Sequence, residues 1–213
     1  MVGEVPRLEM MVPEMATAVD APAAPAAAPA ATPAVTAVAI VAGCAALALR
    51  PLLWRATANP DGALVVLFVV LLAAGACLPV PGAAGARRRR RRGPVAVPLG
   101  VGALAFGAAR VLGGGHGPSG GFWKLLVLNG LAAVAEEAFF RRLVYGALLA
   151  AGPAVAVGGS AVLFALVHVT TYGFWVLPLD LAAGALLGWQ RATSGRWSVP
   201  AITHILANAL VLL

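Results

Sequence analysis

Charged residues are scarce in this chain of 213 residues, since Asp, Glu, Lys and Arg together make up only 11%, against about 25% in a soluble domain. Hydrophobic residues make up 61%, and several apolar runs approach the roughly 20 residues that are needed to cross a bilayer. These values exclude an ordinary soluble domain. Because backbone polar groups in lipid must be satisfied within each helix, the composition predicts an all-α fold, a polytopic transmembrane helical bundle.

Acidic residues and cysteines are the rarest reactive side chains. The chain has eight acidic residues, and four of them lie in its first 20 residues. The other four are Asp61, Glu136, Glu137 and Asp180. The two cysteines, Cys44 and Cys77, both lie in apolar runs and lack the spacing of metal ligands. We therefore interpret the cysteines as small packing residues.

The net charge of +7 would suggest a nucleic-acid or anionic partner in a soluble protein. Here six of the fifteen basic residues form one run, 87–92, so the positive charge belongs mostly to one loop and no nucleic-acid partner is predicted. Basic loops tend to stay in the cytoplasm, so the run is interpreted as a topology determinant that gives a cytoplasmic N-terminus. Binding of anionic lipid head groups is the alternative.

Apolar runs divide the chain after an Ala/Pro-rich tail, residues 1–33. The prolines of this tail prevent a stable helix, and its acidic residues argue against a cleaved secretory signal, so we predict that it is disordered. Seven apolar runs follow, which predicts about seven spans. The runs are 34–49, 62–80, 94–112, 122–151, 154–172, 176–190 and 198–213.

Two adjacent glutamates, Glu136 and Glu137, lie in the middle of the apolar run 122–151. Charge at the centre of a membrane helix costs several kcal/mol unless a partner compensates it, so the pair is a functional-site hypothesis. Successive helix residues point about 100° apart, so the two carboxylates have different roles. Glu137 is expected to pair with Arg141 one turn further on, whereas Glu136 is the candidate general base.

Polar residues with helical spacing recur in later runs, at His168 and at His204 and Asn208. With a rise of about 1.5 Å per residue, depth in the bundle can be counted along the chain. Glu136 lies 16 residues before the turn at Gly152 and His168 lies 16 residues after it, which places both at one level. The same count brings His204 within roughly 10 Å of that level, so these side chains are expected to converge in one pocket.

Two chemistries fit such a pocket. A water between Glu136 and His168 could be activated to attack a carbonyl, while His204 and Asn208 donate hydrogen bonds to the oxyanion. Alternatively, Glu136, His168 and His204 could hold a catalytic zinc ion with one open position. The sequence does not distinguish between these two chemistries. Buried polar pairs can also hold membrane helices together without any catalytic role.

Other conspicuous residues are given structural interpretations. Asp180 is expected near a helix end, Phe164 beside the pocket as packing, and His116 in a solvated glycine-rich loop. Gly184 and Gly188 form a pair of small residues four apart, which predicts a close helix contact.

Three motifs in this order, Glu136-Glu137-x-x-x-Arg141, Phe164-x-x-x-His168 and His204-x-x-x-Asn208, resemble those of the CPBP intramembrane proteases. That family includes the CAAX prenyl protease (Rce1-like) and bacteriocin-processing (Abi) enzymes. The segment 193–200, before His204, also resembles the family's approach to its third motif.

The resemblance covers roughly residues 120–213. It implies a catalytic transmembrane domain at 119–213, preceded by N-terminal transmembrane helices at 34–118 that include the arginine loop. The functional residues implied are Glu136, Glu137, Arg141, His168, His204 and Asn208.

The resemblance further implies an intramembrane peptidase, either a zinc metalloprotease or a metal-free glutamate protease. Membrane lipids and a peptide or protein at the membrane are the expected partners, and the Ala/Gly/Arg-rich composition suggests the cell membrane of a bacterium. A prenylated substrate is not assigned, because prenylated proteins are characteristic of eukaryotes. A non-enzymatic scaffold or bacteriocin-immunity protein and a small proton-relay transporter are the competing functions. The oligomeric state is not predicted.

Overall fold

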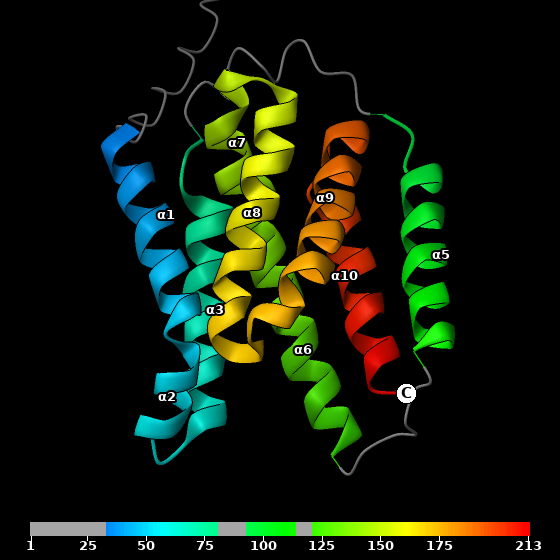
Figure 1. The fold of residues 1–213 in the computed structure, drawn as a ribbon. Helices are drawn as coiled ribbons and strands as arrows, with labels where there is room; N and C mark the ends of the chain where they lie inside the picture. The colour runs from blue at the N-terminus through cyan, green and yellow to red at the C-terminus, as the bar shows by residue number, and fades with distance from the viewer. Residues whose placement is uncertain (1–32, 81–92, 114–120) are drawn as a thin grey trace, which may run out of the picture.

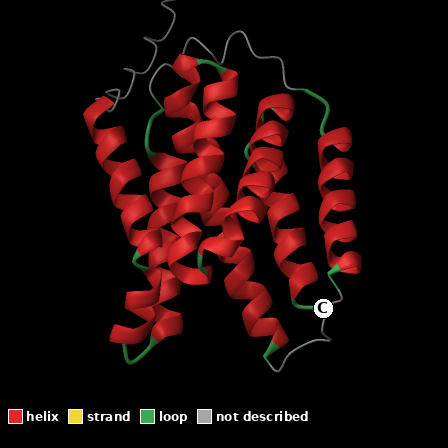
Figure 2. Ribbon diagram, in the orientation of Figure 1, coloured by secondary structure: helices red, strands yellow, loops and turns green. Residues whose placement is uncertain are grey.

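Helices form all the regular structure in the part of the chain that the computed structural model describes, residues 33–80, 93–113 and 121–213 (Figures 1 and 2). The predicted tail before residue 33, the arginine run 87–92 and His116 lie outside these residues. The elements are α1 (Pro33–Ala48), α2 (Arg50–Ala56), α3 (Pro60–Cys77), α5 (Ala96–Leu112), α6 (Phe122–Glu137), η1 (Ala138–Val144), α7 (Tyr145–Leu148), η2 (Leu149–Ala151), α8 (Pro153–Tyr172), η3 (Phe174–Val176), α9 (Leu177–Ser194) and α10 (Ser198–Val211).

The all-α prediction is confirmed, and each of the seven predicted runs contains a helix. The number of spans is a separate matter. Among the described residues, α3 and α8 are long and apolar enough to cross a membrane, and α1 with α2 would add a third if that bent pair is one span. The count of two or three does not confirm seven spans, which stays a prediction.

The helices stand side by side, with α1 and α5 at opposite edges of the bundle (Figure 1). Polar contacts fasten α5 and the residues just before it to α9 and α10. The Gly93 amide donates to the Ser194 carbonyl (3.3 Å), the Gln190 side chain donates to the Pro98 carbonyl (2.7 Å), and Arg110 Nε donates to the Leu210 carbonyl (2.8 Å). Although α5 stands at the edge, its orientation toward α9 and α10 is therefore fixed.

The α1–α2 pair bends by 55°, and Pro51 explains the bend. Proline lacks a backbone N–H and its ring clashes with the preceding turn, so a helix breaks or kinks there. The Thr170 hydroxyl, from α8, donates to the Ala48 carbonyl at the break (2.7 Å). The bend is therefore tied directly to α8.

A π-helical segment, η1, follows the two glutamates directly. Its wider turn disturbs the regular hydrogen-bond ladder of the helix, and arginine side chains link this segment to α9 and to the end of α3. Arg191 Nε donates to the Arg141 carbonyl (2.9 Å). Arg142 Nη1 donates to the Leu78 carbonyl (3.0 Å) and also contacts the Gly75 carbonyl of α3. Such π-bulges occur frequently at functional sites.

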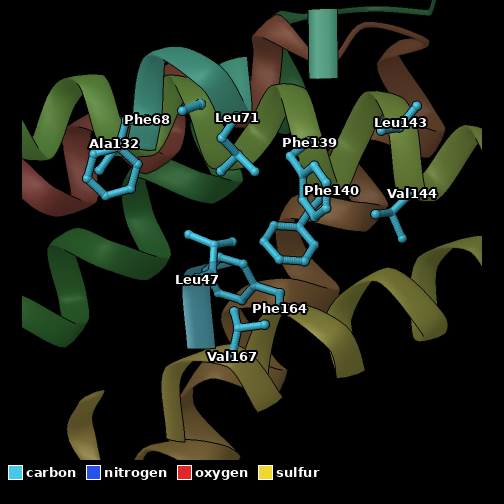
Figure 3. Close-up of a cluster of buried hydrophobic side chains, with 11 residues drawn as sticks. Leu47, Phe68, Leu71, Ala132, Phe139, Phe140, Leu143, Val144, Phe164 and Val167 are labelled. Carbon is cyan, nitrogen blue, oxygen red and sulfur yellow. The ribbon is translucent and has the colours of Figure 1, made fainter. Parts of the chain in front are cut away.

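The hydrophobic core lies where η1 meets α1, α3 and α8 (Figure 3). Phe139 and Phe140 pack edge to face with ring centroids 5.0 Å apart, and Phe140 packs in the same way on Phe164 at 5.5 Å. Edge-to-face pairs are a favourable aromatic geometry. This packing fixes α8 against the segment that carries the glutamates.

Glycines allow close helix contacts, including those at Gly184, Gly188 and Gly75. A Cβ atom added at Gly184 would lie 3.0–3.2 Å from atoms of Ala161, and one at Gly188 would lie 3.1 Å from Val157 Cγ1. The close contact predicted from this pair of small residues is the α8–α9 interface. Gly75 is tighter still, because its added Cβ would lie 2.6 Å from the Ala138 carbonyl carbon and the Phe139 nitrogen.

Replacing Gly75 with Ala is expected to destabilise the protein by about 1–3 kcal/mol, because inserting a methyl group into a packed backbone contact forces the two helices apart. Thermal unfolding in detergent measures the change. Gly107→Ala is the matched control, since an added Cβ there meets no atom within 4 Å, and helix propensity predicts a gain of about 0.5–1 kcal/mol. An unchanged melting temperature for Gly75→Ala would contradict the tight α3–η1 contact.

Candidate active site

Two of the predicted side chains, His168 and His204, converge on one carboxylate oxygen of a third, Glu136. Glu136 Oε2 lies 3.9 Å from His168 Nε2 and 4.0 Å from His204 Nε2. The three residues come from α6, α8 and α10, and all are buried, Glu136 with only 3% of its surface exposed. The structure therefore brings together the groups that the depth count along the helices placed at one level.

Hydrogen bonds at Nδ1 orient both imidazole rings. His168 Nδ1 lies 2.8 Å from the Phe164 carbonyl oxygen, and His204 Nδ1 lies 3.0 Å from Glu137 Oε1. A backbone carbonyl oxygen can only accept a hydrogen bond, and so can the oxygen of an ionised carboxylate. With Glu137 ionised, each Nδ1 therefore carries a proton. In the neutral tautomer each Nε2 then presents a lone pair toward Glu136 Oε2.

Glu137 and Arg141 form the ion pair next to this centre. Arg141 Nε lies 3.3 Å from Glu137 Oε2, and both side chains are fully buried. Arg141 Nη2 also donates to the Gly184 carbonyl (3.3 Å), and its guanidinium lies 4.7 Å from the centroid of the Phe164 ring. Glu137 thus links Arg141 on one side to His204 on the other, which orients His204.

Asn208 lies in the same region but does not contact Glu136 in any interaction that the structure describes. Its Nδ2 donates a hydrogen bond to the Asn129 carbonyl of α6 (3.1 Å). An amide nitrogen carries two hydrogens, so this bond fixes the amide plane and a second hydrogen remains. Asn208 lines the cavity beside both histidines.

A cavity of about 540 Å³ adjoins the histidines. Its wall is mainly apolar and comes from α5, α8, α9 and α10, while Arg110, Asp180 and Asn208 add polar groups. The lining residues are Phe106, Ala109, Arg110, Gly113, Phe164, His168, Tyr172, Leu179, Asp180, Ala183, Leu187, His204, Ala207, Asn208, Leu210 and Val211.

Two further charged residues lie near Glu136 and His168, and the sequence did not predict either of them there. Asp180 lies in the first turn of α9, near a helix end as expected, but its Oδ2 lies 3.8 Å from His168 Nδ1 and its side chain lines the cavity. Arg50 Nη1 lies 3.8 Å from Glu136 Oε1. A single arginine followed by proline at the end of an apolar run looks like a helix terminus, so only the fold reveals this contact.

The predicted zinc ligands are Glu136, His168 and His204, and their second contacts suit a metal site. Metal-bound histidines usually donate their other ring N–H to a carboxylate or carbonyl, as both do here. Nevertheless, the described residues contain no group of three or more His, Cys, Asp or Glu side chains placed to hold a metal ion. The zinc site therefore stays a prediction, and no catalytic step is assigned to a metal.

These features define a helical protein with a polar centre of one glutamate and two histidines beside a largely apolar cavity. The family model described as type II CAAX prenyl endopeptidase Rce1-like matches residues 118–210. This match agrees with the resemblance seen in the three motifs, and residues 118–210 are similar to the Rce1-like family. No curated protein and no solved structure matches the chain.

The match covers less than half of the chain but includes all six predicted site residues. Arg50 and the whole of α5 lie outside it. The similarity to this family and the apolar helices together indicate a membrane protein.

Proposed function

We propose that the protein is an intramembrane endopeptidase that hydrolyses peptide bonds of membrane-associated substrates with a water activated by Glu136. The observation that carries this proposal is the convergence of both imidazole Nε2 atoms on Glu136 Oε2, at 3.9 and 4.0 Å. These separations are too long for direct hydrogen bonds. One water molecule, which has two hydrogens to donate, would bridge Glu136 to a histidine at ordinary distances.

In the proposed reaction Glu136 removes a proton from this water, which His168 orients, and the hydroxide attacks the carbonyl carbon of the peptide bond. The tetrahedral oxyanion then accepts hydrogen bonds from Asn208 and from His204 when its Nε2 is protonated. Collapse of the intermediate breaks the C–N bond, and protonated Glu136 returns its proton to the leaving amine. Glu137 and Arg141 keep His204 oriented throughout.

The size and lining of the cavity support a peptide substrate. Ligand sites commonly have volumes of about 300–1,000 Å³, apolar walls and a few converging polar groups, and the cavity beside His168 and His204 has this character. We assign no prenyl group to the substrate. A multi-pass location in a bacterial cell membrane belongs to the same proposal.

Hydrolysis in ¹⁸O-labelled water tests the proposal. The purified protein is reconstituted in liposomes with a panel of membrane-anchored peptides, and the products are identified by mass spectrometry. Cleavage should place one ¹⁸O atom in each new C-terminal carboxyl group. A scaffold or immunity protein gives no product, and a proton-relay transporter gives proton flux without cleavage, so either result would overturn the proposal.

The metal question is answered with the same samples by measuring zinc content alongside activity. About one zinc per chain, with activity lost on chelation and restored by zinc, would support the metalloprotease alternative. Activity that is unaffected by chelation would support water activated by glutamate alone.

A further inference from the structure

Arg50 reaches the centre from a part of the chain that lies outside the Rce1-like domain. It is the first residue of α2, directly after the 55° bend that Pro51 produces. The bend directs the start of α2 toward α8. The side chain of Arg50 is only 15% exposed, so its charge is held within the bundle and needs partners there.

The structure shows three contacts that hold the Arg50 guanidinium. Nη1 lies 3.8 Å from Glu136 Oε1, and Nη2 donates to the Thr171 hydroxyl at 3.2 Å. The guanidinium also lies 5.9 Å from the centroid of the Tyr172 ring, which stacks on the His168 ring at 5.9 Å and 10°. Arg50 therefore lies within ion-pair distance of Glu136, and the Tyr172 ring lies between Arg50 and His168.

The two oxygens of Glu136 have different surroundings. Oε1 faces Arg50, whereas Oε2 faces His168 Nε2 and His204 Nε2. Attraction between the guanidinium and the nearer oxygen favours one orientation of this buried carboxylate, which directs the other oxygen toward the histidines. We infer that Arg50 is a positioning residue, which holds Glu136 by Oε1 and keeps Oε2 aimed at the water between Glu136 and His168. This inference rests on the proposed peptidase function.

A merely structural role for Arg50, fastening α2 to α8, does not require a charge near Glu136. The Thr170 hydroxyl already bonds to the Ala48 carbonyl at 2.7 Å and fastens the bend to α8. Arg50 adds a charge aimed at Glu136, which a fastening role does not require. Thr170 and Arg50 therefore offer separate variants for fastening and for positioning.

Arg50→Ala is expected to lower kcat roughly 10- to 100-fold, because a small misplacement of a catalytic group costs up to about this much. KM should change less than about twofold, since Arg50 is not among the residues that line the cavity. Arg50→Lys keeps the charge and should recover part of the loss. Arg55→Ala, the exposed arginine of the same helix, should leave kcat unchanged.

Thr170→Val serves as the fastening control and should lower the melting temperature while kcat stays near the wild-type value. If Arg50→Ala keeps the wild-type kcat while Glu136→Gln is inactive, the peptidase proposal stands and the role of Arg50 is refuted. The same conclusion follows if Arg50→Lys is no better than Arg50→Ala.

A second measurement does not depend on activity, and so separates this inference from the proposed function. The melting temperatures of Arg50→Ala, Glu136→Gln and the double variant form a cycle. If the two groups interact, the double variant loses less than the sum of the single losses. Additive losses would refute the contact between Arg50 and Glu136, even if wild type cleaved no peptide in the panel.

Discussion

Replacing Glu136 with Gln is expected to reduce kcat/KM by roughly 10²- to 10⁴-fold, the usual contribution of a general base. Glutamine has nearly the same shape and keeps an oxygen for Arg50, but its amide cannot accept the proton from water. The loss should lie in kcat, because the substrate cavity is unchanged. Cleavage of a membrane-anchored peptide under single-turnover conditions measures it.

The control for this experiment is Asp61→Asn. Asp61 is a partly exposed carboxylate at the start of α3, paired with Lys124 on α6 rather than with the histidines. The same chemical change there should leave the rate within about twofold of wild type, since exposed ion pairs contribute little. A Glu136→Gln variant that kept a tenth or more of the wild-type rate would rule out Glu136 as the general base.

Removing Arg141 should have the largest effect on stability. Arg141→Met is expected to cost about 3–5 kcal/mol, the typical result when one partner of a buried ion pair is deleted and the other charge stays buried. Glu137 is fully buried and, among the described residues, would keep the hydrogen bond from His204 as its one hydrogen bond. Reversible unfolding in mixed detergent, followed by circular dichroism, measures the change.

Two companion variants show whether the uncompensated charge is the cause. Adding Glu137→Gln to Arg141→Met removes that charge and should restore part of the lost stability. Lys124→Met breaks an ion pair that is largely exposed, so it should cost less than about 1 kcal/mol. If Arg141→Met were no more harmful than Lys124→Met, Glu137 would not be held as a buried anion by Arg141.

The meeting of Glu136, His168 and His204 was predictable because it depends only on helix geometry. A fixed rise per residue sets depth, and equal chain lengths on either side of Gly152 set one level for α6 and α8. The rotation of each ring about its bonds depends on partners from other helices. The contact of His204 with Glu137 could therefore not be read from the sequence.

The π-helical segment and the contact of Arg50 were missed for a related reason. The run 122–151 has the apolar pattern of a continuous helix. The wider turn at Ala138–Val144 is accompanied by hydrogen bonds from two arginines: Arg142 donates to the Leu78 carbonyl at the end of α3, and Arg191 donates to the Arg141 carbonyl of the segment itself. Such long-range contacts leave no periodic signal. The arginine at position 50 carries no signal either, because its role depends on a bend and on a distant helix.

The span count shows the limit of hydropathy. Helices α5 and α10 are apolar but have only 17 and 14 residues, short of the roughly 20 that cross a bilayer without tilt or thinning. A run of apolar residues predicts a helix well, but it does not set how far that helix extends through lipid.

The position of α5 suggests how one reaction could serve many substrates. This helix carries none of the six motif residues, yet Phe106, Ala109 and Arg110 form one wall of the cavity, and a few polar contacts fasten it to α9 and α10. The cavity wall therefore combines α5, which carries no motif residue, with α8, α9 and α10. Replacing α5 with the corresponding helix of a relative is expected to alter the preference for peptides while the proposed hydrolytic step is preserved.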